Sequence, residues 1–292
     1  MAIDYTTKFS TMLDKKYAAE SKTYDLTLSN KGVSFVNANT LKIPMLTVGG
    51  YKYHTRGNTY NKANISNTFQ TKVLSHDRDA EFIIDAMDVE ETSAIVSIAN
   101  IQNTFEEQQA IPEWDAYRLS KLYQDMCDFD KDATEVAANS AAVLAWFDAV
   151  SVNMDDAGVP LEGRILYCTP AYKKLLEQSL TRQLSAKDKA FENTIERISE
   201  TKLIGVPSAR MYTAYDFTTG FTPEDGADEM AMILVHPSAV VARTKYAYMK
   251  AFQPGSDSRT ADAWIYQIRQ YGDLFLLKNK VAGVEIALKA SN

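Results

Sequence analysis

The segment DRDAEFIIDAMDVEET (residues 77–92) decides how this chain folds, because it changes from a strand pattern to a helix pattern within a few residues. Alternation places Phe82 and Ile84 on one side, as a half-buried strand requires. Asp88, with Glu91 three residues later, resembles the capping box that begins a helix. Seven carboxylates lie between residues 77 and 91. The earlier of these acids alternate along the strand, and the later ones crowd the start of the helix. Since carboxylates stabilise the first turn of a helix, we interpret the cluster as helix-terminal electrostatics rather than a catalytic pair.

The preceding stretch, Leu26 to His76, has the opposite charge character. Its fifty-one residues contain no Asp or Glu and six Lys or Arg. A segment with this composition presents a cationic surface, and we expect that surface to meet an acidic partner outside the segment itself.

Strict alternation within this stretch predicts a long two-stranded hairpin. The first strand is predicted over residues 51–56, with Tyr51, Tyr53 and Thr55 on one side and Lys52, His54 and Arg56 on the other. Gly57-Asn58 is a turn signal, and the return strand places Phe69, Thr71 and Val73 opposite Gln70, Lys72 and Leu74. Isolated two-stranded hairpins are marginal in water, so docking on another surface should help to hold it. The alternative is a solvated edge hairpin within a larger sheet.

A long helix is predicted after the acidic segment. Ile95, Ile98, Ile101 and Phe105 mark one apolar face. Pro112 either restarts or kinks the helix, and apolar residues continue the face to about Cys127.

The rest of the chain mixes both kinds of element. We predict a helix over 139–157, a strand over 164–168 and a helix from 170 to about 180. Broken strands over 194–213, a polar loop over 216–229 and a buried strand over 230–235 follow, and a last hairpin pairs 240–253 with 261–276. Without a regular βαβ repeat, this order indicates an α+β fold. Residues 1–40 are polar and weakly periodic, which is typical of an arm that lies on other surfaces.

Composition excludes several classes of protein. The chain has 292 residues, a net charge of −7 and a pI near 5.1, which disfavours a dedicated nucleic-acid binder. It has neither an apolar run long enough to span a membrane nor the pattern of a signal peptide, so we expect it to stay in the cytosol until something larger forms. With two cysteines and three scattered histidines, neither a disulfide framework nor a zinc site is expected.

No catalytic signature is present. The motifs GxSxG, GxxxxGK[ST], GxGxxG and HExxH do not occur in the sequence, and no cofactor is expected. Asp128, Asp130 and Asp132 alternate as in a calcium loop, but Ala133 stands where Gly is needed and Asn139 where Glu is needed. We therefore favour an acidic loop between helices. The bases of a single-stranded nucleic acid could stack on Tyr51 and Tyr53. One basic hairpin in an acidic chain, however, supplies few positive charges to bind phosphates, so we disfavour this interpretation.

The order of these parts resembles the Hong Kong 97-like major capsid proteins of tailed bacteriophages, especially those of phages that infect Gram-positive bacteria. The similar segments cover most of the chain: residues 77–92, AIPEWDAYRLSKLY (110–123), DDAGVPLEGRILYCTPAYKKLL (155–176), GVPSARMY (205–212) and MILVHPSAVVARTKYAYMKAF (232–252). None of these strings is specific alone, and the resemblance rests on their combination and order.

The resemblance implies a division of the chain into parts. These are an N-terminal arm (1–40), an extended loop hairpin (41–86), a peripheral domain with a long spine helix (87–138 and 236–279), an axial domain (139–235) and a C-terminal strand (280–292) whose domain stays open.

It also implies a mechanical function rather than an enzymatic one. Many copies would form hexamers and pentamers in an icosahedral shell around double-stranded DNA, made in the host cytoplasm and ending in the virion capsid. A separate scaffolding protein, a portal and non-specific contact with packaged DNA are the further partners. The alternatives are an encapsulin-like nanocompartment shell and, more distantly, a carboxylate-dependent enzyme.

The residues and the resemblance lead to one hypothesis about assembly. The hairpin of one copy lies over the spine helix of the next, where lysines and arginine meet carboxylates. The residues assigned to this interface are Tyr51, Lys52, Tyr53, Arg56, Lys62, Phe69 and Lys72 on the hairpin, and Glu106, Glu107, Glu113 and Asp115 on the spine helix.

Overall fold

The computed structural model describes residues 21–27, 40–54, 56, 62–85, 98–181, 197–255 and 262–290. The chain divides into a smaller unit, Lys31–Ser75, and a larger unit, Met1–Asn30 with His76–Asn292, and each is considered by itself. Several expectations lie outside the described residues: most of the arm, the turn at Gly57-Asn58, the capping box of Asp88 and Glu91, and Ile95.

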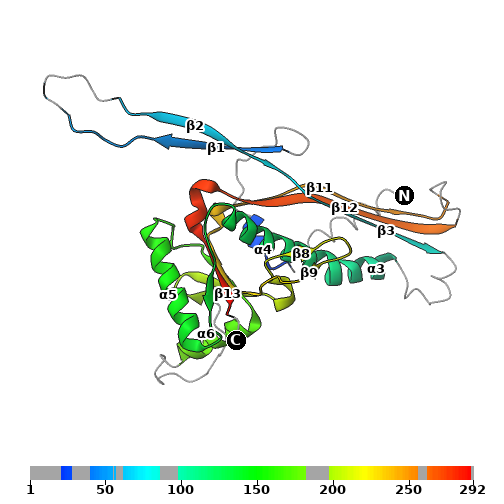
Figure 1. Cartoon of the computed structure of the whole chain (residues 1–292). Helices are drawn as coiled ribbons and strands as arrows, with labels where there is room; N and C mark the ends of the chain where they lie inside the picture. The colour runs from blue at the N-terminus through cyan, green and yellow to red at the C-terminus, as the bar shows by residue number, and fades with distance from the viewer. Residues whose placement is uncertain are drawn as a thin grey trace. The chain divides into compact units, whose positions relative to one another are not determined.

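The smaller unit contains a two-stranded antiparallel hairpin (Figure 1). β1 (Thr40–Val48) pairs with β2 (Ile65–Val73) in a register that sets Thr40 opposite Val73 and Val48 opposite Ile65. The predicted return strand is confirmed by β2.

The predicted first strand over residues 51–56 is wrong. Residues 51–54 form no strand, and the first strand lies earlier, at Thr40–Val48, in sequence that we expected to belong to the arm or to the start of the hairpin. Pro44 lies within it and cannot donate a ladder hydrogen bond, yet each strand of a two-stranded sheet has an open edge where proline is tolerated. Gly49 closes the ladder by donating to the Asn64 carbonyl at 2.8 Å.

The larger unit contains a three-stranded antiparallel sheet in the order β11-β12-β3. Its strands are β3 (His76–Asp85), β11 (Val240–Phe252) and β12 (Ala263–Leu276). The last predicted hairpin is therefore confirmed. β3, which lies within the span assigned to the extended loop hairpin (41–86), is a separate strand that pairs with β12.

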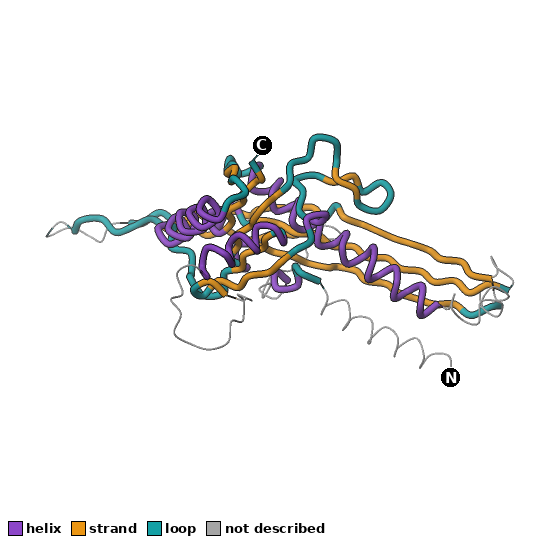
Figure 2. The backbone as a smooth tube through the Cα atoms, turned by 90° about the horizontal axis from the view of Figure 1, so that it is seen from below, coloured by secondary structure: helices purple, strands orange, loops and turns teal. Residues whose placement is uncertain are grey.

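A continuous helical stretch lies along one face of this sheet (Figure 2). It consists of α3 (Ile98–Phe105), a π-helical turn (Glu106–Ala110) and α4 (Ile111–Cys127). The π-helical turn accommodates Pro112, which has no N–H to donate. Just before the proline, the Ile111 N–H donates to the Glu106 carbonyl, five residues earlier in the chain. The predicted spine helix thus continues through its proline. The Tyr117 hydroxyl fixes it to β12 by donating to Asp273 at 2.7 Å.

A six-stranded sheet forms the second layer of the larger unit, with α5 (Ser140–Asp156) and α6 (Pro170–Thr181) beside it (Figure 1). The strands, in order, are β4 (Thr134–Val136), β13 (Val284–Lys289), β10 (Met230–Val235), β5 (Ile165–Cys168), β7 (Thr201–Gly205) and β6 (Arg197–Ile198). The predicted helices and both predicted buried strands are confirmed. The remaining short elements are η1 (Tyr24–Thr27), η3 (Ser208–Arg210), η4 (Pro237–Ala239), η5 (Lys278–Gly283) and the strand pair β8 (Tyr215–Asp216) and β9 (Thr222–Pro223).

β10 separates two hydrophobic clusters. Every residue of this strand is buried, with Ile233 in the cluster that includes Leu122 of α4 and Leu234 in the cluster that includes Phe147 of α5. Because adjacent side chains of a strand point to opposite faces, both faces of the sheet are covered. No helix in the described part of the chain is both long and apolar enough to cross a membrane.

Candidate functional site

One face of the β1–β2 hairpin carries apolar side chains that are exposed. The pairing register places alternate residues of both strands on this face, and the apolar ones are Leu46, Val48, Ile65, Phe69 and Val73. Their exposed fractions run from 56% for Val73 to 72% for Ile65. The opposite face includes Leu41 and Ile43, which are buried. We call the five exposed residues the hairpin face.

The structure distributes the predicted hairpin residues over two places. Phe69 belongs to the hairpin face, whereas Lys72 is half-buried on the opposite face, paired with Leu41. The others lie in the loop that joins the two strands, where Tyr51, Lys52, Tyr53, Arg56 and Lys62 are all exposed.

The sequence analysis placed Phe69 and Val73 on one side of the return strand but missed the other three residues of the hairpin face: Leu46, Val48 and Ile65. Leu46 and Val48 alternate along TLKIPMLTV (40–48), and this signal was present in the sequence. Pro44 weakens this signal, because proline is disfavoured within a strand unless the strand has an open edge.

Asp115 lies in α4 with its side chain fully buried and surrounded by donors. Its Oδ1 accepts from the Ser21 hydroxyl at 2.8 Å and from the N–H and hydroxyl of Thr23 at 3.1 and 2.7 Å. Its Oδ2 accepts from the Lys22 N–H and from Arg210 Nη1, both at 3.1 Å. One carboxylate therefore joins the spine helix to residues 21–23 and to η3.

The other carboxylates assigned to the spine surface differ in exposure. Glu106 is buried, and Glu113 is largely covered and accepts from Arg78 Nε. Burial raises the pKa of Glu113, although Arg78 opposes this effect. Glu107 is exposed. The hypothesis of a spine surface made by all four carboxylates is therefore corrected: Glu106, Glu113 and Asp115 are covered within their own chain, and Glu107 is the one at the surface.

His76 begins β3 inside an aromatic cluster. Its ring stacks on Tyr117 with centroids 3.7 Å apart, and the edges of Trp114 and Phe217 lie at 4.8 and 5.3 Å. Burial, together with the smaller effect of the nearby Arg78 guanidinium, lowers the pKa of His76 to about 3. The imidazole is therefore neutral at physiological pH.

Arg78 closes this cluster on its polar side. Besides Glu113, it donates to the Phe217 carbonyl at 2.6 Å and to the Gly220 carbonyl at 3.4 Å. The loop that contains β8 and β9 is thereby held against the base of β3.

The outward face of β3 carries a row of exposed carboxylates: Asp77, Asp79, Glu81 and Asp85. Arg269 of β12 binds Asp77 through two hydrogen bonds of 3.0 and 2.5 Å, and this contact lowers the pKa of Asp77. We call these four residues the acidic row. They are four of the seven acids that the sequence places between residues 77 and 91.

The calcium interpretation finds no support in the geometry. Among the described residues, no group of three His, Cys, Asp or Glu side chains lies close enough to hold a metal ion. Asp130 adopts a left-handed conformation, with a φ of 58°, in the turn that follows α4.

Comparison with known proteins identifies the fold. No protein family model and no curated protein sequence matches the chain. The mature capsid of bacteriophage PhiM1 aligns with a TM-score of 0.67 and 14% identity, over 87% of this chain and 83% of that chain. The head of Helicobacter pylori bacteriophage KHP40 aligns with a TM-score of 0.61 and 11% identity, over 94% and 91%. The capsid of cyanophage P-SCSP1u aligns with a TM-score of 0.59 and 14% identity, over 90% and 87%.

These similarities define the class of fold: it is the α+β fold of phage capsid structures. The Hong Kong 97-like fold expected from the sequence is confirmed.

Replacing Asp115 with Asn should destabilise the larger unit by about 3 kcal/mol, because Arg210 loses its charged partner in a buried site. Denaturant unfolding of the unassembled chain measures this loss. The matched control is Asp79→Asn in the acidic row, which should change stability by less than about 0.5 kcal/mol. Equal stability of the two variants would contradict the anchoring role.

Acidification should destabilise the protein through His76. Its folded pKa, about 3, lies below the unfolded value of 6.5, so the unfolded chain binds more protons between these values. The stability contributed by neutral His76 is complete above pH 6.5 and falls as the pH decreases toward 3. The His76→Phe variant keeps a stacked ring but has no imidazole to protonate. Between pH 6.5 and 4.5 its free energy of unfolding should fall by about 2 kcal/mol less than that of the unaltered chain. His54→Phe, an exposed control, should retain the original pH dependence.

Proposed function

We propose that this chain is the major capsid protein of a tailed bacteriophage, which assembles as hexamers and pentamers into an icosahedral shell around double-stranded DNA. The fold similarity to phage capsid structures over most of both chains supports this function. The hairpin face carries the proposal, because its exposure is best explained by contact with a second copy of the chain.

The energetics of the hairpin face favour such a contact. Burying one large apolar side chain fully is worth about 1.5–3 kcal/mol, and five such side chains lie together on this face. A two-stranded hairpin has little core of its own, so docking stabilises the hairpin as well as the assembly. The proposed role is therefore mechanical, and no catalytic step is assigned to the chain.

In this proposal the parts of the chain take the places that the sequence resemblance implies. The hairpin is the extended loop, and residues 1–40 include the arm. The three-stranded sheet with α3 and α4 is the peripheral domain. The six-stranded sheet with α5 and α6 is the axial domain, and the pairing of β13 with β10 and β4 supports placing the last strand with it.

The charges supply a second, weaker contact. We place the cationic loop of the hairpin, with Arg56 and Lys62, over Glu107 and the acidic row of a neighbouring copy. Each exposed ion pair is worth at most about 1 kcal/mol. Repeated around a closed shell, such pairs give reversible contacts that are collectively strong.

The other proposed partners are a separate scaffolding protein, a portal and packaged DNA, the last through non-specific contacts. The chain would assemble in the host cytoplasm and end in the virion capsid. These assignments rest on the resemblance to the capsid family.

Electron microscopy of the expressed chain tests the function, with closed shells as the expected result. Leu46→Gln with Phe69→Gln removes apolar area from the hairpin face and should raise the protein concentration needed for assembly at least tenfold. The matched control, Thr47→Gln with Thr68→Gln, changes exposed residues of the opposite face and should assemble normally. A stable monomer that never forms shells would refute the proposal. Native shells that lack DNA would indicate a nanocompartment instead.

Reversing two charges tests the ionic contact. Arg56→Glu with Lys62→Glu should reduce the yield of shells while leaving the circular dichroism of the unassembled chain unchanged, since both side chains are exposed. Adding Glu107→Lys should restore part of the yield if this carboxylate faces the loop. Normal shells from the double variant would show that these charges are dispensable.

A further inference from the structure

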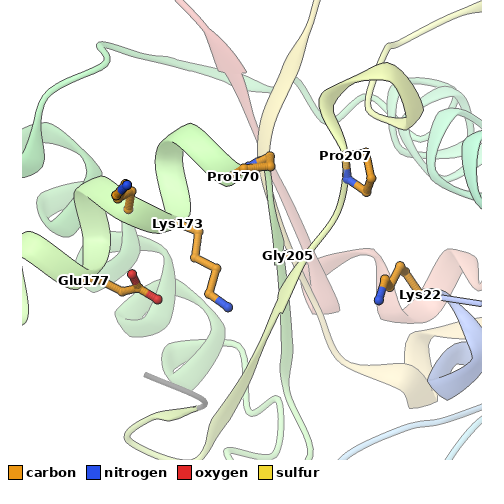
Figure 3. Close-up of a pocket in the computed structure, with 7 residues that line it drawn as sticks. Lys22, Pro170, Lys173, Glu177, Gly205 and Pro207 are labelled. Carbon is orange, nitrogen blue, oxygen red and sulfur yellow. The ribbon is translucent and has the colours of Figure 1, made fainter. Parts of the chain in front are cut away.

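A cationic pocket of about 440 Å³ lies in the larger unit. Lys22 comes from the described segment 21–27, and Lys173 and Lys174 come from α6. Figure 3 shows Lys22 and Lys173 reaching toward one another from either side of the strand end at Gly205. Lysines that are about 150 residues apart in sequence are therefore brought to one cavity.

The backbone that carries these lysines is held in place. The backbone N–H of Lys22 donates to the Asp115 carboxylate. Three residues later, Asp25 pairs with Lys202 of β7 at 2.6 Å. α6 begins at Pro170 beside the pocket, and β7 is held by parallel pairing with β5. The cavity is thus a feature of ordered elements rather than of a single loop.

Gly205 forms part of the wall beside Lys173. A Cβ atom at this position would lie 3.4 Å from Cδ of Lys173, in van der Waals contact with the lysine stem. The remaining walls are made by Pro170 and Pro207, which present compact apolar surface.

The charges in the pocket are not balanced. Within the part of the chain that the structure describes, no carboxylate lies within ion-pair distance of the side chains of Lys22, Lys173 or Lys174. Lys202 and Lys289, in contrast, each pair with a carboxylate at 2.6 Å. Among the described residues of the lining, Glu177 is the single carboxylate, and three lysines accompany it.

We propose that this pocket binds phosphate groups of the double-stranded DNA that the shell encloses; the inference rests on the proposed capsid function. Lysine recognises phosphate as a point charge and needs no fixed geometry. The lining residues that the structure describes include no aromatic ring for base stacking and no arginine fork, so the contact is with the DNA backbone and independent of base sequence.

The same lining disfavours an acidic protein segment as the occupant. Carboxylates are bound best by the two parallel hydrogen bonds of an arginine. The described lining residues include no arginine. A phosphodiester needs only positive charge and room, which the pocket supplies.

Weak binding at each copy suits this role. The chain has a net charge of −7, so its surface as a whole repels DNA, and the pocket is a local exception. Each copy holds one or a few phosphates, and the shell multiplies this contact. DNA is retained at many points without being immobilised at any one of them.

The test is binding of a fluorescent 20-base-pair duplex to the unassembled full-length chain at several salt concentrations. The pocket variant is Lys22→Gln, Lys173→Gln and Lys174→Gln together. We expect it to bind at least fivefold more weakly at low salt, and to flatten the slope of log affinity against log salt by about 1 to 2. The control variant, Lys250→Gln, Lys278→Gln and Lys280→Gln, makes the same change in charge outside the pocket and should bind like the unaltered chain.

Two results would overturn the inference. Equal binding by the pocket and control variants would show that the pocket does not bind the duplex. A glutamate-rich peptide of equal charge that displaces the duplex at equal concentration would assign the pocket to an acidic protein segment. Electron microscopy of the same variants keeps the two proposals apart, because the pocket variant should still form shells. Loss of shells from every variant and from the unaltered chain refutes the capsid function alone.

Discussion

The buried carboxylate of Asp115 is the contact on which the larger unit depends most. It is a charge removed from water, and its two oxygens accept five hydrogen bonds from residues 21–23 and Arg210. Asp125, ten residues later on the same helix and also fully buried, accepts from the Leu276 N–H of β12 at 2.9 Å. Because an unpaired buried carboxylate is very costly, these two residues fix which segments must lie beside α4. The helix thus orders parts of the larger unit that are far apart in sequence.

The hairpin, in contrast, has no buried carboxylate to fix its neighbours. It contains no carboxylate, and its strands expose Leu46, Val48, Ile65, Phe69 and Val73 along one face. A buried charge network specifies a unique internal arrangement, whereas an exposed apolar face is satisfied only by another surface. One chain therefore combines a unit that is stable through its own contacts with a unit whose contacts are proposed to come from a second copy.

Local patterns predicted most of the fold, and long-range contacts explain what they missed. The helix over 139–157 was predicted from its content of Ala and Val and from Gly158, which ends it before Pro160. The structure adds that Asn139 caps it, with its side chain accepting from the Ala142 N–H at 2.8 Å. The first strand of the hairpin was misplaced because the role of Pro44 depends on whether its edge is open, and only the partner strand determines that. Asp115 was assigned to the surface because its donors lie more than 90 residues away in sequence, beyond the reach of helical periodicity. The pocket could not be predicted either, because Lys22 and the lysines of α6 are far apart in sequence.

The two proposed contacts differ in their physical chemistry, and this difference has a consequence for a shell. The hairpin face is apolar, so its contribution does not weaken as salt screens charge, and excluded salts strengthen it. Copies with a net charge of −7 also repel each other less when the Debye length shortens, which favours assembly. The pocket acts through lysines and phosphates, and its affinity for DNA falls as salt rises. The ionic contact between copies also weakens as salt rises, but the apolar hairpin face does not. The bound DNA can therefore loosen while the hairpin face still holds the shell closed.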